Sequence, residues 1–176
     1  MNLLNLARKS IEAELNHVEL SIDEKIKKKF GKPAATFVTL TKNEMLRGCI
    51  GVLKPIRPLW LDVIENAKAS AFNDFRFPPL RKEELPKIKI EVSILSEPRE
   101  IKFSSPEELL KKIDKKMGII LKKGIYCATF LPQVWEEIED KEEFLKHLSR
   151  KASLQEDEWK SSRIFYYRVK SLKEKN

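Results

Sequence analysis

The sequence predicts an α+β fold, with antiparallel sheets and flanking helices. Two observations predict it: strand-like segments come in adjacent pairs joined by short turns, and helix-start signals separate those pairs. The resulting order, α-α-β-β-α-β-α-β-β-α-α-β, lacks the regular alternation of a doubly wound parallel sheet. At 176 residues the chain is long enough for a substantial core, and we interpret 1–176 as a single domain with two lobes of undefined boundary.

The first helix is predicted over residues 1–16, where charged residues interrupt an amphipathic apolar pattern that a signal peptide would keep uninterrupted. A later helix begins at Pro58, and its apolar residues recur at three- and four-residue spacing up to Phe72. Three more starts have capping-box spacing, with helices that run to about residues 29, 116 and 152. These pairs are Ser21 with Glu24, Ser105 with Glu108, and Asp140 with Glu143.

Glycines are expected to end two of these helices and to form one turn. Gly31 and Gly118 stand just beyond two predicted helices, where a left-handed conformation favours glycine. Gly124 separates the predicted strands 119–122 and 125–130 and supplies the turn of a hairpin.

The remaining strands are predicted from alternation and residue type. Residues 34–40 and 46–53 flank the polar turn TKNE, residues 88–95 alternate strictly, and residues 163–169 are aromatic and β-branched. The charged, proline-rich stretch 73–87 is interpreted as an ordered loop or a connection between lobes.

Charge is abundant, with 35 Lys and Arg against 27 Asp and Glu and a net charge of +8. The many lysines and glutamates and the few glutamines resemble the composition of thermophile proteins. One interpretation is therefore that much of this charge stabilises the fold. The basic runs at 25–32, 111–118 and the C-terminal tail lack interleaved aromatics, which favours a solvated surface over a nucleic-acid footprint. No apolar run reaches membrane-spanning length, no disulfide framework is visible, and a cytoplasmic protein is expected.

The segment LRGCIG at 46–51 is the sharpest candidate site. Strand alternation places Arg47, Cys49 and Gly51 on one face, and its two glycines indicate a bulge or a close approach by another backbone or a ligand. Cys49 has two interpretations that stay open here. It is a thiolate nucleophile or ligand whose pKa is lowered by Arg47, or it is a small buried residue.

Other reactive residue types carry weaker signals. His147 is interpreted as a surface or half-buried helix residue and Cys127 as core packing, and the spacing of cysteines and histidines predicts no metal site. The loop 73–80, NDFRFPPL, is interpreted either as functional or as a loop that Phe75 and Phe77 pin to the core, with an Asp74–Arg76 ion pair. No phosphate loop, nucleophile elbow or dinucleotide fingerprint is present, and the sequence identifies no cofactor.

Six motifs in order give the chain a resemblance to the AMMECR family, whose prokaryotic members are called AmmeMemoRadiSam system protein A. They are LRGCIG, KPIRPL, ENAKASAFNDFRFPPL, EELPKIKIEVSIL, GIILKKGIYCATFLPQVW and KEEFLKHLSRKA. The resemblance spans about residues 5–170 and implies a two-lobed α+β fold with LRGCIG near a cleft. This chain departs from the family pattern after LPQVW, where it continues into EEIEDKEEF and relatives often have a glycine-containing turn.

The resemblance implies no established activity, but it does imply a site and a genomic context. Genes of the family often neighbour those of a Memo-type protein and a radical SAM protein, which suggests a shared modification pathway. The resemblance carries over the following site residues: Arg47, Gly48, Cys49, Gly51, Arg57, Glu65, Asn66, Asp74, Arg76, Pro78, Glu91, Ser93 and Gln133.

Two functions are therefore expected to compete. One is an enzyme or substrate-binding subunit that uses Cys49 and Arg47 in a cleft for an anionic small molecule. The alternative is a basic module that binds nucleic acid or protein. If Arg47 and Arg57 point into the cleft, the ligand is a carboxylate or a phosphate, because guanidinium groups match these anions in bidentate geometry. Otherwise Arg47 pairs internally, with Glu65 or Glu91, and holds the strand.

Overall fold

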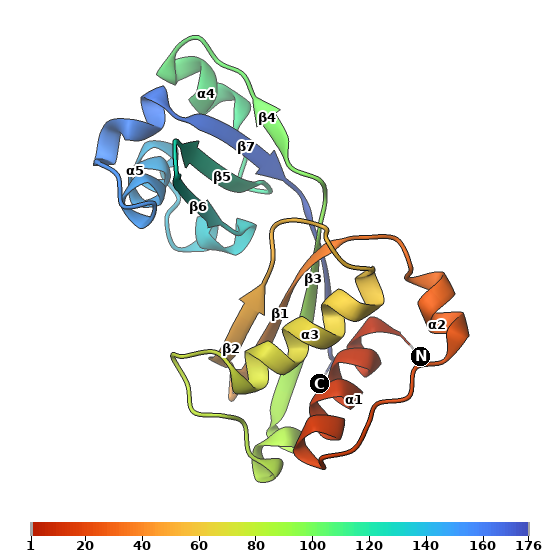
Figure 1. Ribbon diagram of the computed structural model, residues 1–176. Coiled ribbons are helices and arrows are strands. Elements are labelled where there is room, and N and C mark those ends of the chain that lie inside the picture. Colours follow the sequence, from red (N-terminus) through yellow and green to blue (C-terminus); the bar gives the residue numbers. More distant parts are fainter. Residues whose placement is uncertain (1, 176) are drawn as a thin grey trace. The chain divides into compact units, whose positions relative to one another are not determined.

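The computed structural model describes residues 2–175, which form two compact units. The chain up to Leu95 and the segment from Lys170 onward make the first unit, and Ser96–Val169 makes the second. Each unit has its own four-stranded sheet and its own apolar cluster. Figure 1 shows the two sheets as separate sets of arrows. The predicted α+β class with antiparallel sheets is confirmed, whereas the cleft between lobes stays a prediction.

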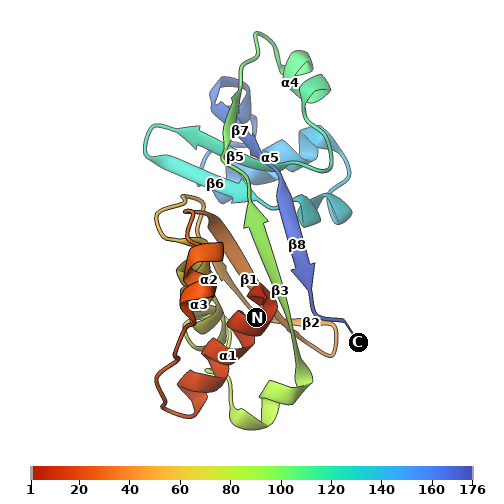
Figure 2. The ribbon, with the colours of Figure 1, turned by 90° about the vertical axis from the view of Figure 1, so that its right-hand side faces the viewer.

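The first unit is a sheet with two helices packed on one side. Its strands run in the order β2-β1-β3-β8, with bounds Met45–Gly51, Ala35–Lys42, Ile88–Leu95 and Val169–Lys173. Figure 2 shows α1 (Leu3–Leu15) and α3 (Leu59–Phe72) on the same side of this sheet. Alternate strand residues meet the apolar stripes of the helices there, and this packing buries Leu6, Ile11, Val38, Leu40, Val63 and Val92.

Two short helical segments complete this unit. The helix α2 covers Glu24–Lys29, and the 3₁₀-helix η1 covers Lys82–Lys87 within the stretch predicted as a loop. The N-cap of α2 is Asp23, which accepts a hydrogen bond from Lys25 N, so the prediction of Ser21 as its cap is wrong. An aspartate one residue before the helix satisfies the free backbone N–H groups as well as a serine does.

The hairpin β1–β2 contains a tight turn and a bulge. Asn43 and Glu44 have φ of 52° and 61°, the left-handed conformations that a two-residue hairpin turn of type I′ needs. Leu40 pairs with Gly48 whereas Thr41 pairs with Leu46, which leaves Arg47 as the extra residue of a β-bulge. The bulge predicted from the glycines is therefore present, and it interrupts the strict alternation expected at Arg47.

Gly48 and Gly51 are also sites of close backbone approach. A Cβ atom at Gly48 would lie 2.1 Å from the carbonyl oxygen of Ser70 on α3. One at Gly51 would lie 2.4 Å from the carbonyl oxygen of Thr36. Any side chain would push β2 away from α3 and β1, so the second expectation for these glycines is confirmed as well.

The second unit has strands in the order β4-β7-β5-β6, with bounds Arg99–Ile101, Arg163–Tyr167, Gly118–Lys123 and Tyr126–Phe130. The helices α4 (Pro106–Lys112) and α5 (Lys141–Lys151) and the 3₁₀-helices η2 (Pro132–Glu136) and η3 (Glu156–Ser161) surround it. Trp135 stacks on Phe144 with ring centroids 3.5 Å apart. Around this pair the core buries Leu109, Ile119, Leu121, Leu148 and Trp159.

Most predicted boundaries of this unit hold. Ser105 and Asp140 cap α4 and α5 as predicted, by accepting from the backbone N–H of the residue three positions on. Helix α4 ends at Lys112 and not near residue 116, and a further short strand, β4, precedes it. The predicted strand 163–169 is in fact two strands, β7 and β8, which belong to different sheets.

The predictions for the glycines and cysteines of this region are only partly right. Gly124, with φ of 58°, forms the hairpin turn, and it is the one glycine with positive φ between residues 2 and 175. Gly118 lies inside β5, and Gly31 is not left-handed either. Cys127 is exposed, so its prediction as core packing is wrong, because its neighbour Ala128 faces the core and strand alternation turns Cys127 to the other face. Across residues 2–175, no helix is long and apolar enough to span a membrane.

Candidate functional site

The backbone of Cys49 is held by two side chains from the loop that follows α3. β2 is an edge strand, and Cys49 N donates to Asp74 Oδ2 at 2.9 Å while Cys49 O accepts from Arg76 Nη2 at 3.1 Å. The Asp74 carboxylate also receives Arg76 Nε at 2.9 Å and Nη2 at 2.7 Å. The ion pair thus takes the place of a neighbouring strand and covers the edge at Cys49. Its guanidinium keeps the pKa of Asp74 well below the ordinary value.

The Cys49 thiol lies beside the hydroxyl of Thr39 on the neighbouring strand β1. Its Sγ lies 3.2 Å from Thr39 Oγ1. Burial raises the pKa of the Cys49 thiol above its ordinary value, and the hydrogen bond from Thr39 and the charge of Arg76 offset only part of that rise. The predicted lowering of this pKa by Arg47 is therefore wrong, since Arg76 is the cation that acts on the thiol.

A polar row crosses three strands from Cys49. Thr39 on β1 is opposite Cys49 in one direction and opposite Glu91 on β3 in the other. Glu91 pairs with Lys173 of β8 at 3.1 Å, and Ser93 Oγ lies 3.4 Å from the Glu91 carboxylate. The structure thus brings together the predicted site residues Cys49, Asp74, Arg76, Glu91 and Ser93.

Arg47 is bound inside the protein. Its Nε and Nη2 donate to the two oxygens of Glu84 at 3.1 and 3.0 Å, and Nη2 also donates to Pro78 O at 2.9 Å. Arg47 and then Lys42 lower the pKa of Glu84 to about 2. The internal pairing of Arg47 is real, but the predicted partners, Glu65 or Glu91, are wrong because η1 brings Glu84 to the bulge.

Arg57 and Asn66 belong to a separate buried network. Arg57 Nε and Nη2 donate to Asp62 Oδ1 at 3.1 and 2.8 Å. The other oxygen of this buried carboxylate accepts from Thr36 N, Thr36 Oγ1 and Asn66 Nδ2 at 2.7–2.9 Å. The network fastens α3 to the start of β1, so these residues hold the fold. The expectation that Arg57 reaches a ligand is not supported by this geometry.

The last two predicted site residues, Glu65 and Gln133, make no contact with the residues around Cys49 that is described above. Glu65 is exposed on α3, and Gln133 is exposed on η2 of the second unit. Neither makes a side-chain hydrogen bond within residues 2–175. Their inclusion in the site stays a prediction.

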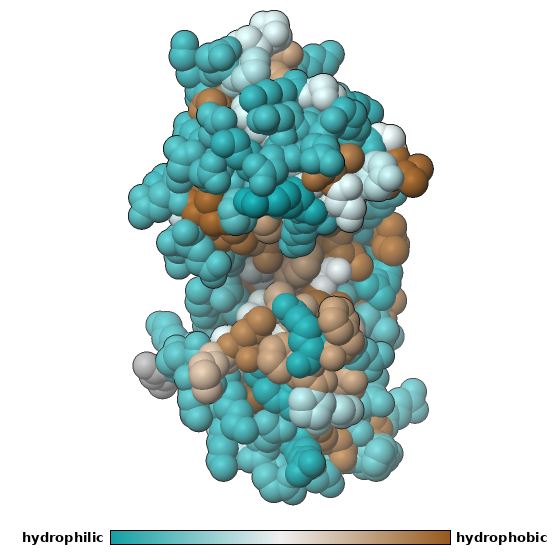
Figure 3. All heavy atoms as spheres, turned by 90° about the vertical axis from the view of Figure 1, so that its left-hand side faces the viewer, coloured by the Kyte–Doolittle hydropathy of each residue, from teal (hydrophilic) through white to brown (hydrophobic). Residues whose placement is uncertain are grey.

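The loop 73–80 presents aromatic rings beside the Asp74–Arg76 pair. Phe75 is 94% exposed, whereas the ring of Phe77 lies 5.9 Å from Arg47 Cζ and 5.6 Å from Arg76 Cζ. The interpretation that both rings pin the loop is therefore wrong for Phe75. Figure 3 shows apolar side chains gathered around a hydrophilic one on this face of the first unit.

Thr39 and Glu84 are functional-site neighbours that the sequence did not single out. A regular two-residue hairpin at Asn43–Glu44 would pair Thr39 with Gly48, and only the bulge moves Cys49 opposite Thr39. No sequence pattern marks Glu84 as a partner of Arg47. It is one of several acids in a charged segment, and only the folding of that segment into η1 brings it to Arg47. Among residues 2–175, no group of three His, Cys, Asp or Glu is placed to hold a metal ion.

This geometry defines a class: an α+β protein of two sheet-centred units with a thiol on a bulged, glycine-rich edge strand. The AMMECR1 family model matches residues 4–172, and the chain belongs to this family. It is 44% identical to Protein NEQ441 of Nanoarchaeum equitans over 90% of each chain. It is 39% identical to Protein MK0488 of Methanopyrus kandleri over 89% of this chain and 78% of that protein. The predicted resemblance of the chain to this family is thus confirmed.

A crystal structure shares the fold. Uncharacterized protein PH0010 from Pyrococcus horikoshii superposes with a TM-score of 0.89 at 36% sequence identity. The match covers 98% of this chain and 90% of that one, so both units take part in it.

Proposed function

We propose that the first unit binds a small anionic molecule beside Cys49, and that Arg76 is its main contact. The observation that carries this proposal is the position of the Arg76 guanidinium. Two of its nitrogens are fixed by Asp74, while its side chain is 43% exposed and Nη1 has no partner among the described residues. A guanidinium already held in place by a buried carboxylate is preorganised for a carboxylate or phosphate.

The chemistry of Cys49 fits binding better than immediate nucleophilic attack. Because burial raises its pKa, the thiol is protonated at neutral pH, and its Sγ lies within hydrogen-bond distance of Thr39 Oγ1. An anion on Arg76 would raise this pKa further, since it removes part of the cationic field. The protein then acts as a substrate-binding subunit, or as an enzyme whose chemistry needs a second component to remove the proton.

That second component is proposed from the genomic context of the family, a Memo-type or radical SAM protein. The proposal predicts that a small anion co-purifies with the full chain or is retained when the three proteins are combined. Native mass spectrometry of the full chain detects it, and a mass shift lost on dialysis identifies a non-covalent ligand.

The direct test uses inorganic phosphate and acetate as probes in a Cys127→Ser background, where Cys49 is the sole thiol. We expect either anion to slow the alkylation of Cys49 by iodoacetamide and to raise the melting temperature. Arg76→Lys should remove the protection, because lysine lacks the planar fork. Arg163→Lys, at an exposed arginine paired with Glu100 in the second unit, is the matched control and should keep it.

Equal protection in a folded Arg76→Lys protein would end the proposal.

No observation favours the alternative of a basic nucleic-acid module, since the basic runs carry their own acids: Lys27 pairs with Glu24, and Lys112 pairs with Glu108. A steep salt dependence of RNA or DNA binding would reverse this preference.

A further inference from the structure

The second unit has one sheet edge without the usual protection against strand addition. The four edges in residues 2–175 differ: β2 is covered at its centre by Asp74 and Arg76, β8 carries Lys170 and Lys173, and β4 has only three residues, two of them charged. β6, with the sequence YCATF, contains no charged residue and no proline. Charged residues and prolines within the strand are devices that block strand addition, and β6 has neither in its sequence.

Composition isolates this edge further. Residues 124–135, GIYCATFLPQVW, contain no Asp, Glu, Lys or Arg in a chain that is 35% charged. Ile125 at the hairpin tip is 93% exposed and Tyr126 is 45% exposed. Large apolar side chains next to an uncharged edge mark an interaction surface more than a solvated one.

The hydrogen-bond pattern of the hairpin shows which backbone groups are free. Gly124 and Ile125 form a two-residue loop, so Lys123 and Tyr126 are its closing hydrogen-bonded pair. Pairs alternate from there, and Cys127 is in a non-bonded pair whose N–H and C=O point away from β5. Thr129 is the next such residue, and its outward C=O accepts from Lys151 Nζ at 3.0 Å. Cys127 therefore offers an exposed donor and acceptor, and Lys151 closes the edge beyond it.

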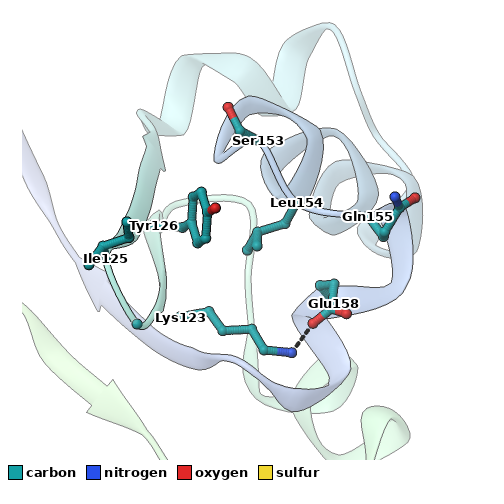
Figure 4. A pocket seen from close by; sticks show the side chains of 8 residues that line it. Lys123, Ile125, Tyr126, Ser153, Leu154, Gln155 and Glu158 are labelled. Carbon is teal, nitrogen blue, oxygen red and sulfur yellow. Dashed lines mark hydrogen bonds and ion pairs between the residues drawn. The ribbon is translucent and has the colours of Figure 1, made fainter.

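A pocket of about 530 Å³ lies at the hairpin end of this edge. Figure 4 shows the ring of Tyr126 and the side chain of Leu154 directed toward each other across it, with the Lys123–Glu158 ion pair along one side. Ile125 points away at the tip. An apolar wall with a few polar groups at the rim is the composition of a site for one large side chain.

We propose that β6 is a docking edge for an extended peptide segment of a partner protein, which pairs with Cys127 and places an apolar side chain between Tyr126 and Leu154. Free N–H and C=O groups in a strand select an extended backbone, because only that backbone presents complementary groups at the same spacing. The occupant is another protein and not a second copy, since two copies of a chain with net charge +8 repel each other. An acidic partner segment is favoured for the same reason, and Lys122 stands opposite Cys127 on β5.

The test selects random nine-residue peptides displayed on phage against the immobilised full chain under reducing conditions. We expect enriched peptides with alternating apolar residues and acidic flanks. Binding of a synthetic enriched peptide should fall at least about tenfold when its alternate backbone nitrogens are methylated, because each methyl removes one donor to the edge. Methylation acts on the probe, so the fold of the protein is not disturbed.

Two protein variants locate the site. Cys127→Pro removes the outward N–H without removing a bond of the β5 ladder and should abolish binding, whereas Cys127→Ala keeps the N–H and should bind as the wild type does. Leu154→Glu places a charge in the pocket and should select against apolar anchors. The absence of enriched peptides, or equal binding by a folded Cys127→Pro protein, would overturn the proposal. So would sedimentation of the wild type as a dimer that Cys127→Pro dissociates, because the occupant would then be a second copy.

Discussion

At the residue scale, Arg47 and Arg76 divide two roles that the sequence left as alternatives for Arg47, internal pairing and contact with a ligand. Arg47 is only 8% exposed, and its Nε and Nη2 donate to Glu84 and Pro78 O, so it holds the bulge against the segment before β3. Arg76 is fixed by Asp74 and remains open to solvent beside Cys49. The buried guanidinium therefore stabilises the strand that carries the thiol, and the exposed one is the candidate ligand contact.

Arg47→Lys is expected to destabilise the fold and leave anion protection of Cys49 unchanged. Lysine keeps the net charge but cannot reach both oxygens of Glu84 and Pro78 O together, which should lower the free energy of unfolding by about 1–3 kcal/mol. Urea unfolding measures that loss, and iodoacetamide protection measures the site. Arg163→Lys, at an exposed pair, should change neither. Loss of protection in folded Arg47→Lys protein would return Arg47 to the ligand site.

The Glu84 carboxylate should make stability depend on pH. Its pKa is lowered from 4.5 to about 2 in the folded protein. A lowered folded-state pKa contributes stability above the unfolded value, and this contribution is lost as pH falls from about 4.5 toward 2. Urea unfolding at several pH values should show that decline, and Glu84→Gln should flatten it while lowering stability at pH 7. An unchanged slope in Glu84→Gln would show that other carboxylates carry it.

At the element scale, two local conformations of the β1–β2 hairpin set the position of Cys49: the bulge at Arg47 and the turn at Asn43–Glu44. The bulge is stabilised by its contacts, whereas the turn is strained. The bulge at Arg47 is secured by the Glu84 pair, and the glycine at residue 48 lets β2 approach Ser70. The turn instead holds Glu44 at φ of 61°, where a side chain with Cβ is strained. The hairpin thus carries strain at its tip and not at the site.

Glu44→Gly is expected to raise the melting temperature by about 2–4 °C, because Asn-Gly is the preferred pair for a type I′ turn. The exposed Glu44–Lys89 ion pair is lost, but surface pairs contribute little. Calorimetry measures the shift. Glu44→Ala serves as the control: it loses the same ion pair without gaining the glycine conformation, so it should not raise the melting temperature. A lower melting temperature for Glu44→Gly would mean that the ion pair outweighs the strain.

The elements themselves were largely predictable because they depend on local signals. The strict alternation at 88–95, the capping residues Ser105 and Asp140 and the Gly124 turn all act within a few residues, and each is found as predicted. The partners of Arg47 and Arg57 were not predictable, since Glu84 and Asp62 are chosen by packing and not by spacing. Cys127 was misjudged because alternation groups residues by face but does not reveal which face meets the core, and here Ala128 is the buried residue.

At the scale of the whole molecule, the last predicted strand, 163–169, also shows what sequence patterns do not reveal about packing. The aromatic run RIFYYRV predicts one strand, yet β7 ends at Tyr167 and β8 begins at Val169 in the sheet of the first unit. Sequence pattern cannot tell which sheet a strand joins when both offer an apolar face. The first unit is consequently built from two separate parts of the chain, and the second from one continuous part.

Ending the chain at Arg168 should therefore destabilise the first unit and leave the second folded. The truncation removes β8 and with it Glu174, whose carboxylate receives Arg8 Nε and Ile90 N at 2.8 and 2.9 Å. It uncovers β3 and leaves the guanidinium of Arg8, half-buried against η1, without its carboxylate. Hydrogen exchange followed by mass spectrometry should show faster exchange in β1 and β3 with unchanged protection in β5 and β7. Glu174→Gln tests the ion pair alone and should show a smaller effect confined to α1 and β3. Equal loss of protection in β5 would mean that the two cores fold as one cooperative unit.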